Sequence, residues 1–164
     1  MSRAYVSLGS NLGERPAYLR AAVEALGRGP EMKVLAASKV YETAPVEVEG
    51  EQPDYLNCVA KLECGVSAIE LLRYCQGVEV ALGRERGEAG EKAPRTIDVD
   101  VLLFDDEVIE EPGFEVPHRG VTRAFNLKGL ADLDPGLDIP GRGRVVELLA
   151  GADLRGIEEV GELC

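Results

Sequence analysis

The chain is poor in the residues that build zinc centres and disulfide frameworks. Its 164 residues include one histidine, four cysteines and no tryptophan. The cysteines are Cys58, Cys64, Cys75 and Cys164, and no two of them form a Cys-x-x-Cys pair. Because a structural zinc site needs four Cys or His ligands at short spacings, this composition argues against one. Free thiols in apolar segments fit a reducing compartment, so we expect a cytoplasmic protein.

Long apolar runs and an excess of positive charge are also missing. No stretch approaches the roughly 20 apolar residues of a membrane-spanning helix, and residues 1–8 lack the hydrophobic region of a signal peptide. The 18 basic residues are outnumbered by 30 acidic ones, which gives a net charge of −12. Since a nucleic-acid backbone demands a basic surface, we expect neither nucleic acid nor membrane as a partner. Binding of small phosphorylated substrates remains compatible with this acidic composition, because a bound divalent cation reverses the local charge.

The remaining composition is that of one ordinary globular domain spanning residues 1–164, with 45% apolar and 29% charged residues. Hydrophobic periodicity predicts strands over 4–8, 32–41, 55–63 and 94–104. Periodicity and capping signals predict helices over 16–27, 67–83, 125–133 and 145–149. We also expect a turn over 9–13 and a mobile charged loop over 87–92. The second and third strands are joined without a helix. This order therefore predicts an α+β fold with a largely antiparallel sheet.

The last predicted strand carries the most informative residues of the chain. Apolar residues alternate through it, and Asp98 and Asp100 occupy the opposite face. A solvated strand face is the usual explanation for two such acids. Aspartate is poorly suited to a strand interior, however, so the pair favours a site for a hard cation such as magnesium. Without a nearby histidine or thiolate, zinc is disfavoured.

Three arginines lie close to this strand in the sequence: Arg84, Arg86 and Arg95. A surface network of salt bridges with neighbouring glutamates would account for them. Their guanidinium groups also suit phosphate oxygens, and they flank the loop that leads to the two aspartates. Metal ligands beside arginines indicate phosphate chemistry.

Other candidate residues carry weaker signals. Tyr55 and Asn57 share one strand face and could form a wall for a flat heterocycle, although packing is the default role of the tyrosine. Gln76 and Glu79 share a helical face that is ordinarily solvent-exposed. His118 is the one histidine, and a structural role is the usual explanation for such a residue.

Together these segments resemble the 6-hydroxymethyl-7,8-dihydropterin pyrophosphokinase family of folate biosynthesis. The most specific match is residues 92–103, which include both aspartates. Weaker matches, in the family's order, are residues 8–13, 52–57, 116–118 and 123–125. The resemblance implies a ferredoxin-like βαββαβ core with an antiparallel sheet flanked by helices and with extra C-terminal strands and helices. It also implies transfer of pyrophosphate from MgATP to the hydroxymethyl group of the dihydropterin, with release of AMP.

The resemblance further implies a role for each candidate residue. Asp98 and Asp100 would hold two Mg²⁺ ions on ATP, and Arg84 and Arg95 would be the catalytic arginines that neutralise the moving phosphates. The pterin would be bound by Thr43, Val46, Tyr55, Asn57 and Phe125. ATP would be bound by Gln76, Glu79, Arg84, Arg86, Arg95, Val101, His118 and Arg123. The chain would act as a monomer on these two small molecules.

Two other functions are compatible with the same residues. One is a different magnesium-dependent Asp-x-Asp enzyme, such as a nucleotidyltransferase that releases pyrophosphate in place of AMP. The other is a ferredoxin-like module that binds a ligand without turnover. The small product, and the effect of removing either aspartate, would separate the three.

Overall fold

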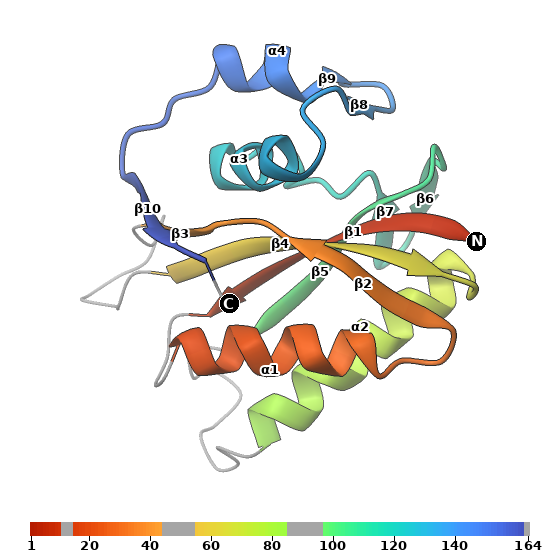
Figure 1. Cartoon of the computed structure of the whole chain (residues 1–164). Helices are drawn as coiled ribbons and strands as arrows, with labels where there is room; N and C mark the ends of the chain where they lie inside the picture. The colour runs from red at the N-terminus through yellow and green to blue at the C-terminus, as the bar shows by residue number, and fades with distance from the viewer. Residues whose placement is uncertain (11–14, 44–54, 85–96, 163–164) are drawn as a thin grey trace.

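The computed structural model of the chain describes residues 1–10, 15–43, 55–84 and 97–162 (Figure 1). Helices and strands are interspersed along the chain. In order they are β1 (Ser2–Ser10), α1 (Arg15–Gly27), β2 (Met32–Ala37), β3 (Val40–Thr43), β4 (Tyr55–Cys64), α2 (Ala68–Arg84), β5 (Asp98–Phe104), β6 (Ile109–Glu111), β7 (Phe114–Val116), α3 (Ala124–Leu133), β8 (Asp138–Ile139), β9 (Gly143–Arg144), α4 (Val145–Ala150) and β10 (Ile157–Gly161).

A six-stranded sheet runs through the middle of the described residues. Its strand order is β10-β3-β4-β1-β5, with β2 also paired to β4, and every pairing is antiparallel. If β2 and β3 are taken as one interrupted strand, the order of the four core strands is that of a ferredoxin-like βαββαβ fold. The α+β class and the antiparallel sheet expected from the sequence are confirmed.

Helices cover both faces of the sheet (Figure 1). On one face, Val6 and Leu8 of β1 pack in a core with residues of α1 and α2 such as Leu19 and Leu71. On the other face, Val59 of β4 belongs to a second apolar cluster with residues of α3 and α4. Burial of apolar surface on both faces is the main stabilising contribution to such a layered fold.

Several helix boundaries follow from local chemistry and confirm the sequence predictions. The Ser67 backbone N–H donates to Glu70 Oε1 at 3.1 Å, and the Glu70 N–H donates to Ser67 Oγ at 3.3 Å. This reciprocal capping box begins α2. The hydrogen bond from the Ser67 backbone also lowers the pKa of Glu70. Helices α1, α3 and α4 start within a residue of their predicted positions.

The strands differ from the predictions in three ways. The predicted turn over 9–13 is wrong at Gly9 and Ser10, because β1 continues through both residues, while residues 11–14 lie outside the described residues. The single strand predicted over 32–41 is divided, because Ser38 Oγ accepts the Val59 N–H at 2.8 Å where a backbone carbonyl would continue the ladder. The strands β6–β9 have only two or three residues, too few for a periodic signal, and β10, Ile157–Gly161, shows no regular alternation in its sequence.

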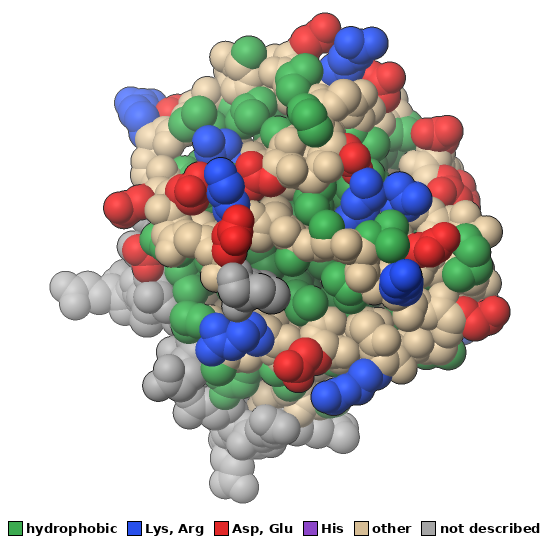
Figure 2. All heavy atoms as spheres, in the orientation of Figure 1, with side chains coloured by type: hydrophobic (Ala, Val, Ile, Leu, Met, Phe, Trp, Pro, Cys, Tyr) green, Lys and Arg blue, Asp and Glu red, His purple; other side chains and the backbone are tan. Residues whose placement is uncertain are grey.

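The surface is consistent with the mixed charge of the chain. On the face shown in Figure 2, acidic and basic side chains are interspersed. The exposed large apolar side chains are spread over several elements, for example Leu35 on β2, Val80 on α2 and Val146 on α4. Among the described helices, none is long and apolar enough to cross a membrane. The predicted loop over 87–92 lies outside the described residues.

The packing of α3 on β4 gives a test of the fold. A Cβ added to Gly129 of α3 would lie 2.5 Å from Val59 Cγ2, so Gly129→Ala should push the helix off the sheet. We expect a loss of about 1–3 kcal/mol in the free energy of unfolding, measured by urea titration. Gly77→Ala is the matched control, since Gly77 lies inside α2 with open space around it. The control should stabilise the protein by about 0.5–1 kcal/mol, and equal effects of the two substitutions would contradict the packing described.

Candidate active site

Three neighbouring strands bring polar side chains together at one level of the sheet. In the antiparallel register, Gly9 of β1 pairs with Asn57 of β4 on one side and with Asp98 of β5 on the other. Residues paired in this way project to the same face. Leu8 and Val99, the next pair along, pack in the core against α1 and α2. The polar row therefore lies on the opposite face, on the side of α3.

The alternation predicted for the aspartate strand is confirmed. Asp98 and Asp100 are partly exposed, whereas Val99 and Val101 between and beyond them are only 3% and 2% exposed. Within the described residues, no group of three or more Cys, His, Asp and Glu side chains could hold a metal ion. Two carboxylates on one face fit Mg²⁺, because Mg²⁺ commonly takes one or two protein carboxylates and completes its shell with water and substrate phosphates.

Glu79 of α2 holds the backbone between the two aspartates. Its Oε2 accepts a hydrogen bond from the Val99 N–H at 2.9 Å. Strand β5 is an edge strand of the sheet. On its outer side, the Val99 N–H therefore has no strand partner among the described residues. The carboxylate satisfies a backbone group that would otherwise need water. A contact between Glu79 and a nucleotide, implied by the resemblance, stays a prediction.

His118 reaches the same face from the segment after β7. Its Nδ1 accepts a hydrogen bond from the Gly120 N–H at 2.9 Å, so a neutral ring carries its proton on Nε2. That Nε2 lies 3.9 Å from Asp100 Oδ1. The histidine therefore presents a donor toward one of the two carboxylates.

On the other side of Gly9, Asn57 and its neighbours form the candidate wall for a heterocycle. Asn57 is 6% exposed, and its Nδ2 donates to Thr43 Oγ1 at 2.9 Å. Tyr55 pairs with Thr43 in the register of β3 and β4 and is partly exposed. A Cβ on Gly9 would lie 3.0 Å from Asn57 Oδ1 and 3.8 Å from Tyr55 Cδ1. Glycine thus leaves the space that the amide occupies.

The other predicted residues are placed less closely together. Phe125 is partly exposed and Arg123 exposed, both at the start of α3. Gln76 is exposed on α2. Val101 packs in the core beside α1 and α2, which leaves its backbone as the part available to a ligand.

Part of the predicted site cannot be placed. Val46, Arg86 and Arg95 lie outside the described residues. Arg84 is the last residue of α2, and its side chain also falls outside the description. The proposed grouping of arginines around phosphate therefore stays a prediction.

The cysteines near the site are not nucleophiles at neutral pH. Burial raises the pKa of the Cys58 thiol to about 12. Burial also raises the pKa of Cys75 to about 12, and the carboxylates of Glu79 and Asp100 add to the shift. Both thiols therefore stay protonated, and thiolate is the form that attacks or binds metal.

A pocket of about 190 Å³ adjoins His118 and is lined by Gly113, Phe114, Glu115, His118 and Arg119. It is formed around the β6–β7 hairpin, in which Glu111 pairs with Phe114. Gly113 in the hairpin loop has φ of 79°, a conformation that favours glycine. The Pro-Gly sequence of this loop is the signal from which the hairpin could have been predicted.

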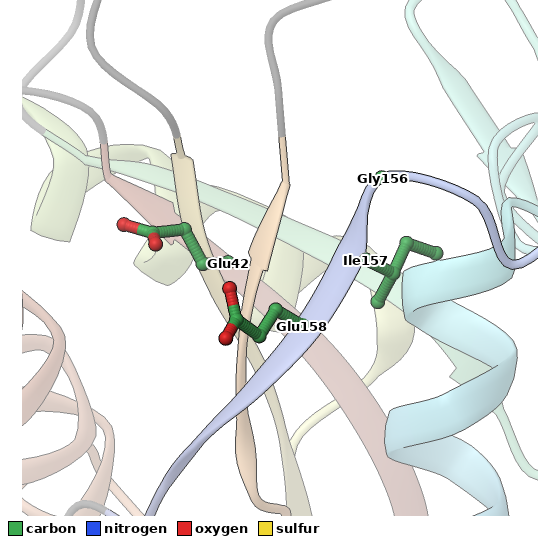
Figure 3. A pocket seen from close by; sticks show the side chains of 4 residues that line it. All are labelled: Glu42, Gly156, Ile157 and Glu158. Atoms are coloured by element: carbon green, nitrogen blue, oxygen red, sulfur yellow. The ribbon is translucent and has the colours of Figure 1, made fainter.

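A larger pocket of about 380 Å³ lies where β10 joins β3 (Figure 3). Glu42, Gly156, Ile157 and Glu158 line it, and the two glutamates are directly paired across the strands. Figure 3 shows both carboxylates on the side away from Ile157. The pocket lining carries two carboxylates and no basic side chain, which disfavours the binding of free phosphate.

Sequence reasoning did not single out Ser7 and Asn126 of this face, and it assigned Gly9 to a turn. Ser7 pairs with Asp100, and its Oγ donates to Asn126 Oδ1 at 3.0 Å. A serine within the apolar alternation of β1 is the signal that could have pointed to a buried polar contact. No local signal connects it with Asn126, because the two residues are 119 positions apart.

The fit of Asn57 over Gly9 can be tested. Gly9→Ala should displace the Asn57 amide and weaken its hydrogen bond to Thr43, with a cost of about 1 kcal/mol in the free energy of unfolding. The side-chain amide resonances of Asn57 should shift in NMR spectra. Gly136→Ala is the control, because a Cβ there meets nothing within 4 Å. Unchanged Asn57 resonances in Gly9→Ala would refute the close approach.

Comparison with known proteins agrees with these features. The family model for 7,8-dihydro-6-hydroxymethylpterin-pyrophosphokinase matches residues 5–135. The 2-amino-4-hydroxy-6-hydroxymethyldihydropteridine pyrophosphokinases of Pseudomonas aeruginosa and Methylorubrum extorquens are 38% and 40% identical over 161 residues. Each alignment covers 98% of this chain, with 98% of the first relative and 99% of the second.

The fold is shared with solved structures of much lower identity. A crystal structure of Plasmodium falciparum HPPK-DHPS with SDX-DHP has a TM-score of 0.70 at 15% identity. The matched region covers 92% of this chain and 43% of the Plasmodium falciparum chain. The present chain therefore spans less than half of that longer protein. These structures support the fold, and the sequence comparisons support the family. The chain belongs to the 7,8-dihydro-6-hydroxymethylpterin-pyrophosphokinase family.

Proposed function

We propose that the sheet face on the α3 side, centred on Gly9, is the active site for the family reaction. In that reaction pyrophosphate passes from ATP to the hydroxymethyl group of 6-hydroxymethyl-7,8-dihydropterin, a step of folate biosynthesis. One observation carries the assignment. Gly9 pairs with Asn57 on one side and Asp98 on the other, so a heterocycle wall and a pair of cation ligands adjoin on one face.

The reaction is a displacement at the β-phosphorus of ATP. The hydroxymethyl oxygen forms a bond to this phosphorus and loses its proton. The bond from the β-phosphorus to the oxygen that bridges to the α-phosphorus breaks, and AMP leaves with that oxygen. Catalysis of such a transfer depends on positioning and on stabilising charge, and it does not require a strong base.

The family uses ATP as co-substrate together with Mg²⁺. In our proposal Asp98 and Asp100 hold two Mg²⁺ ions, which would neutralise phosphate charge and polarise the β-phosphoryl group. Arg84 and Arg95 serve as the catalytic arginines and bind the transferred phosphates. Support for the metal role comes from the donor set, since both acids are partly exposed on one face and Glu79 fixes the strand between them.

The two substrates occupy opposite sides of Gly9. The pterin lies between Tyr55 and Phe125, with Asn57 on its edge and the segment of Thr43 and Val46 completing the site. Its binding is supported by the Asn57–Thr43 hydrogen bond, which orients the amide. The nucleotide lies on the β5 side, where its proposed contacts are Gln76, Glu79, Arg84, Arg86, Arg95, Val101, His118 and Arg123.

The chain works, in this proposal, as a single cytoplasmic domain and as a monomer that binds no nucleic acid. The three described cysteines are free and buried, which suits a reducing compartment. The spread of exposed apolar side chains over several elements supports the monomer. The net charge of −12 supports the absence of nucleic-acid binding.

Identification of the products tests the reaction. Incubation with MgATP and the hydroxymethyl dihydropterin should yield AMP and the pterin pyrophosphate in equal amounts, resolved by chromatography. Chelation of Mg²⁺ should stop turnover, and its re-addition should restore it. Release of inorganic pyrophosphate without AMP would mean a nucleotidyltransferase and would overturn the proposal.

Substitution of the aspartates tests the metal site. Asp98→Asn and Asp100→Asn should each lower kcat by roughly 100-fold or more, because each removes a charged ligand from the ions that stabilise the moving phosphates. Asp106→Asn is the control, since Asp106 is exposed in the turn after β5 and should leave kcat unchanged. Mn²⁺ bound with a non-hydrolysable ATP analogue, counted by electron paramagnetic resonance, should number two ions per wild-type chain and fewer in the variants. Full activity in either active-site variant would exclude the assigned role.

A further inference from the structure

A polar contact is buried beneath α3, next to the proposed metal ligands. Asn126 of α3 is 5% exposed and Ser7 of β1 is 8% exposed. Ser7 Oγ lies 3.0 Å from Asn126 Oδ1, and Asn126 Nδ2 donates to the Gly120 carbonyl oxygen at 2.8 Å. Elsewhere this surface of α3 is apolar, as at Leu127 and Leu130. A buried amide at this place costs free energy unless its groups are paired, and both its oxygen and its nitrogen are.

The direction of this contact is fixed by chemistry. The Gly120 carbonyl oxygen can only accept, so the amide nitrogen of Asn126 must face it. The amide oxygen then faces Ser7, whose hydroxyl must donate. Each of the three groups has one possible role, and the orientation of the Asn126 side chain is therefore determined.

The same glycine holds the histidine. The Gly120 N–H donates to His118 Nδ1 at 2.9 Å, and a Cβ on Gly120 would lie 3.3 Å from both His118 Nδ1 and Arg123 Nε. The ring therefore directs Nε2 toward Asp100 Oδ1, 3.9 Å away. Asp100 in turn pairs with Ser7 across β5 and β1. Ser7, Asn126, Gly120, His118 and Asp100 thus form a closed chain of contacts, which starts on β1 and returns to it through the pairing with β5.

We propose that Asn126, held by Ser7, is a positioning residue for the nucleotide and magnesium half of the active site. It fixes the turn at Gly120 and so sets where His118 presents its Nε2–H relative to Asp100. Asn126 itself touches neither substrate in this scheme. The inference rests on the proposed function, because His118 and Asp100 matter only if ATP and Mg²⁺ bind there. A purely structural role for Asn126 is the competing explanation.

Steady-state kinetics separate the two explanations. Asn126→Leu removes both hydrogen bonds and keeps the branching and the number of heavy atoms of the side chain, and Ser7→Ala removes the hydroxyl that orients the amide. At a temperature where each variant is folded, we expect KM for MgATP to rise roughly tenfold in Asn126→Leu and by a smaller factor in Ser7→Ala. KM for the pterin should rise by a smaller factor. Thr43, Tyr55 and Asn57 lie across Gly9 from Ser7. The hydrogen bonds from Ser7 through Asn126 to Gly120 do not involve Phe125. Ser7→Thr keeps the hydroxyl and should restore KM for MgATP.

Ser38→Ala is the matched control for loss of a buried hydroxyl. Ser38 is 4% exposed, and its Oγ accepts the Val59 N–H and donates to the Lys39 carbonyl, each at 2.8 Å. Its removal should lower stability as Ser7→Ala does. It should leave KM for MgATP unchanged, since Ser38 makes none of the contacts that link Ser7 to His118 and Asp100.

The single histidine supplies a spectroscopic test that does not depend on turnover. In mildly alkaline buffer, where an ordinary imidazole is neutral, ring ¹⁵N spectra of the wild type should show a protonated Nε2 and an unprotonated Nδ1. Asn126→Leu should shift both ring resonances toward the average of two tautomers, because the Gly120 donor is no longer held. Ser38→Ala should leave them in place.

The outcomes distinguish this inference from the proposed function. If Asp100→Asn abolishes activity while Asn126→Leu and Ser7→Ala keep both KM for MgATP and the histidine spectrum, the inference is wrong and the active site stands. The inference is equally wrong if the two variants lose only stability, as Ser38→Ala should. If Asp100→Asn retains full activity, the proposed site fails, and the inference fails with it.

Discussion

The antiparallel register of β1 is the constraint on which the site depends. This strand lies between β4 and β5, and a shift of one residue would turn its whole side-chain set to the other face. The register is held because Val6 and Leu8 must be buried against α1 and α2. The same requirement places Gly9 between Asn57 and Asp98. Burial of apolar residues on one face thus determines which polar residues meet on the other.

The helix α3 completes that polar face by lying close to the sheet at Gly129. Gly129 allows this approach, since any side chain there would collide with Val59. The close contact buries Asn126 over Ser7, and Phe125, proposed to bind the pterin, precedes Asn126 at the start of the same helix. The packing of one helix therefore serves both halves of the proposed active site. In a close-packed interior such a position cannot change without moving its neighbours.

An acidic protein that handles a highly charged nucleotide needs local positive charge. The chain carries a net charge of −12, and in the proposed site Asp98 and Asp100 would face a ligand that is itself anionic. Magnesium bound to ATP resolves this conflict, since carboxylates then attract the complex that they would otherwise repel.

The sequence by itself determined what depends on neighbours along the chain. Alternation in β5 placed Asp98 and Asp100 on one face, and the Ser67–Glu70 capping box placed the start of α2, because both signals arise within a few residues. Only the tertiary structure decided that Gly9 stays in its strand and that Ser7 meets Asn126, 119 residues away. Such contacts follow from which strands pair and how closely helices pack on them, and no local pattern encodes that choice.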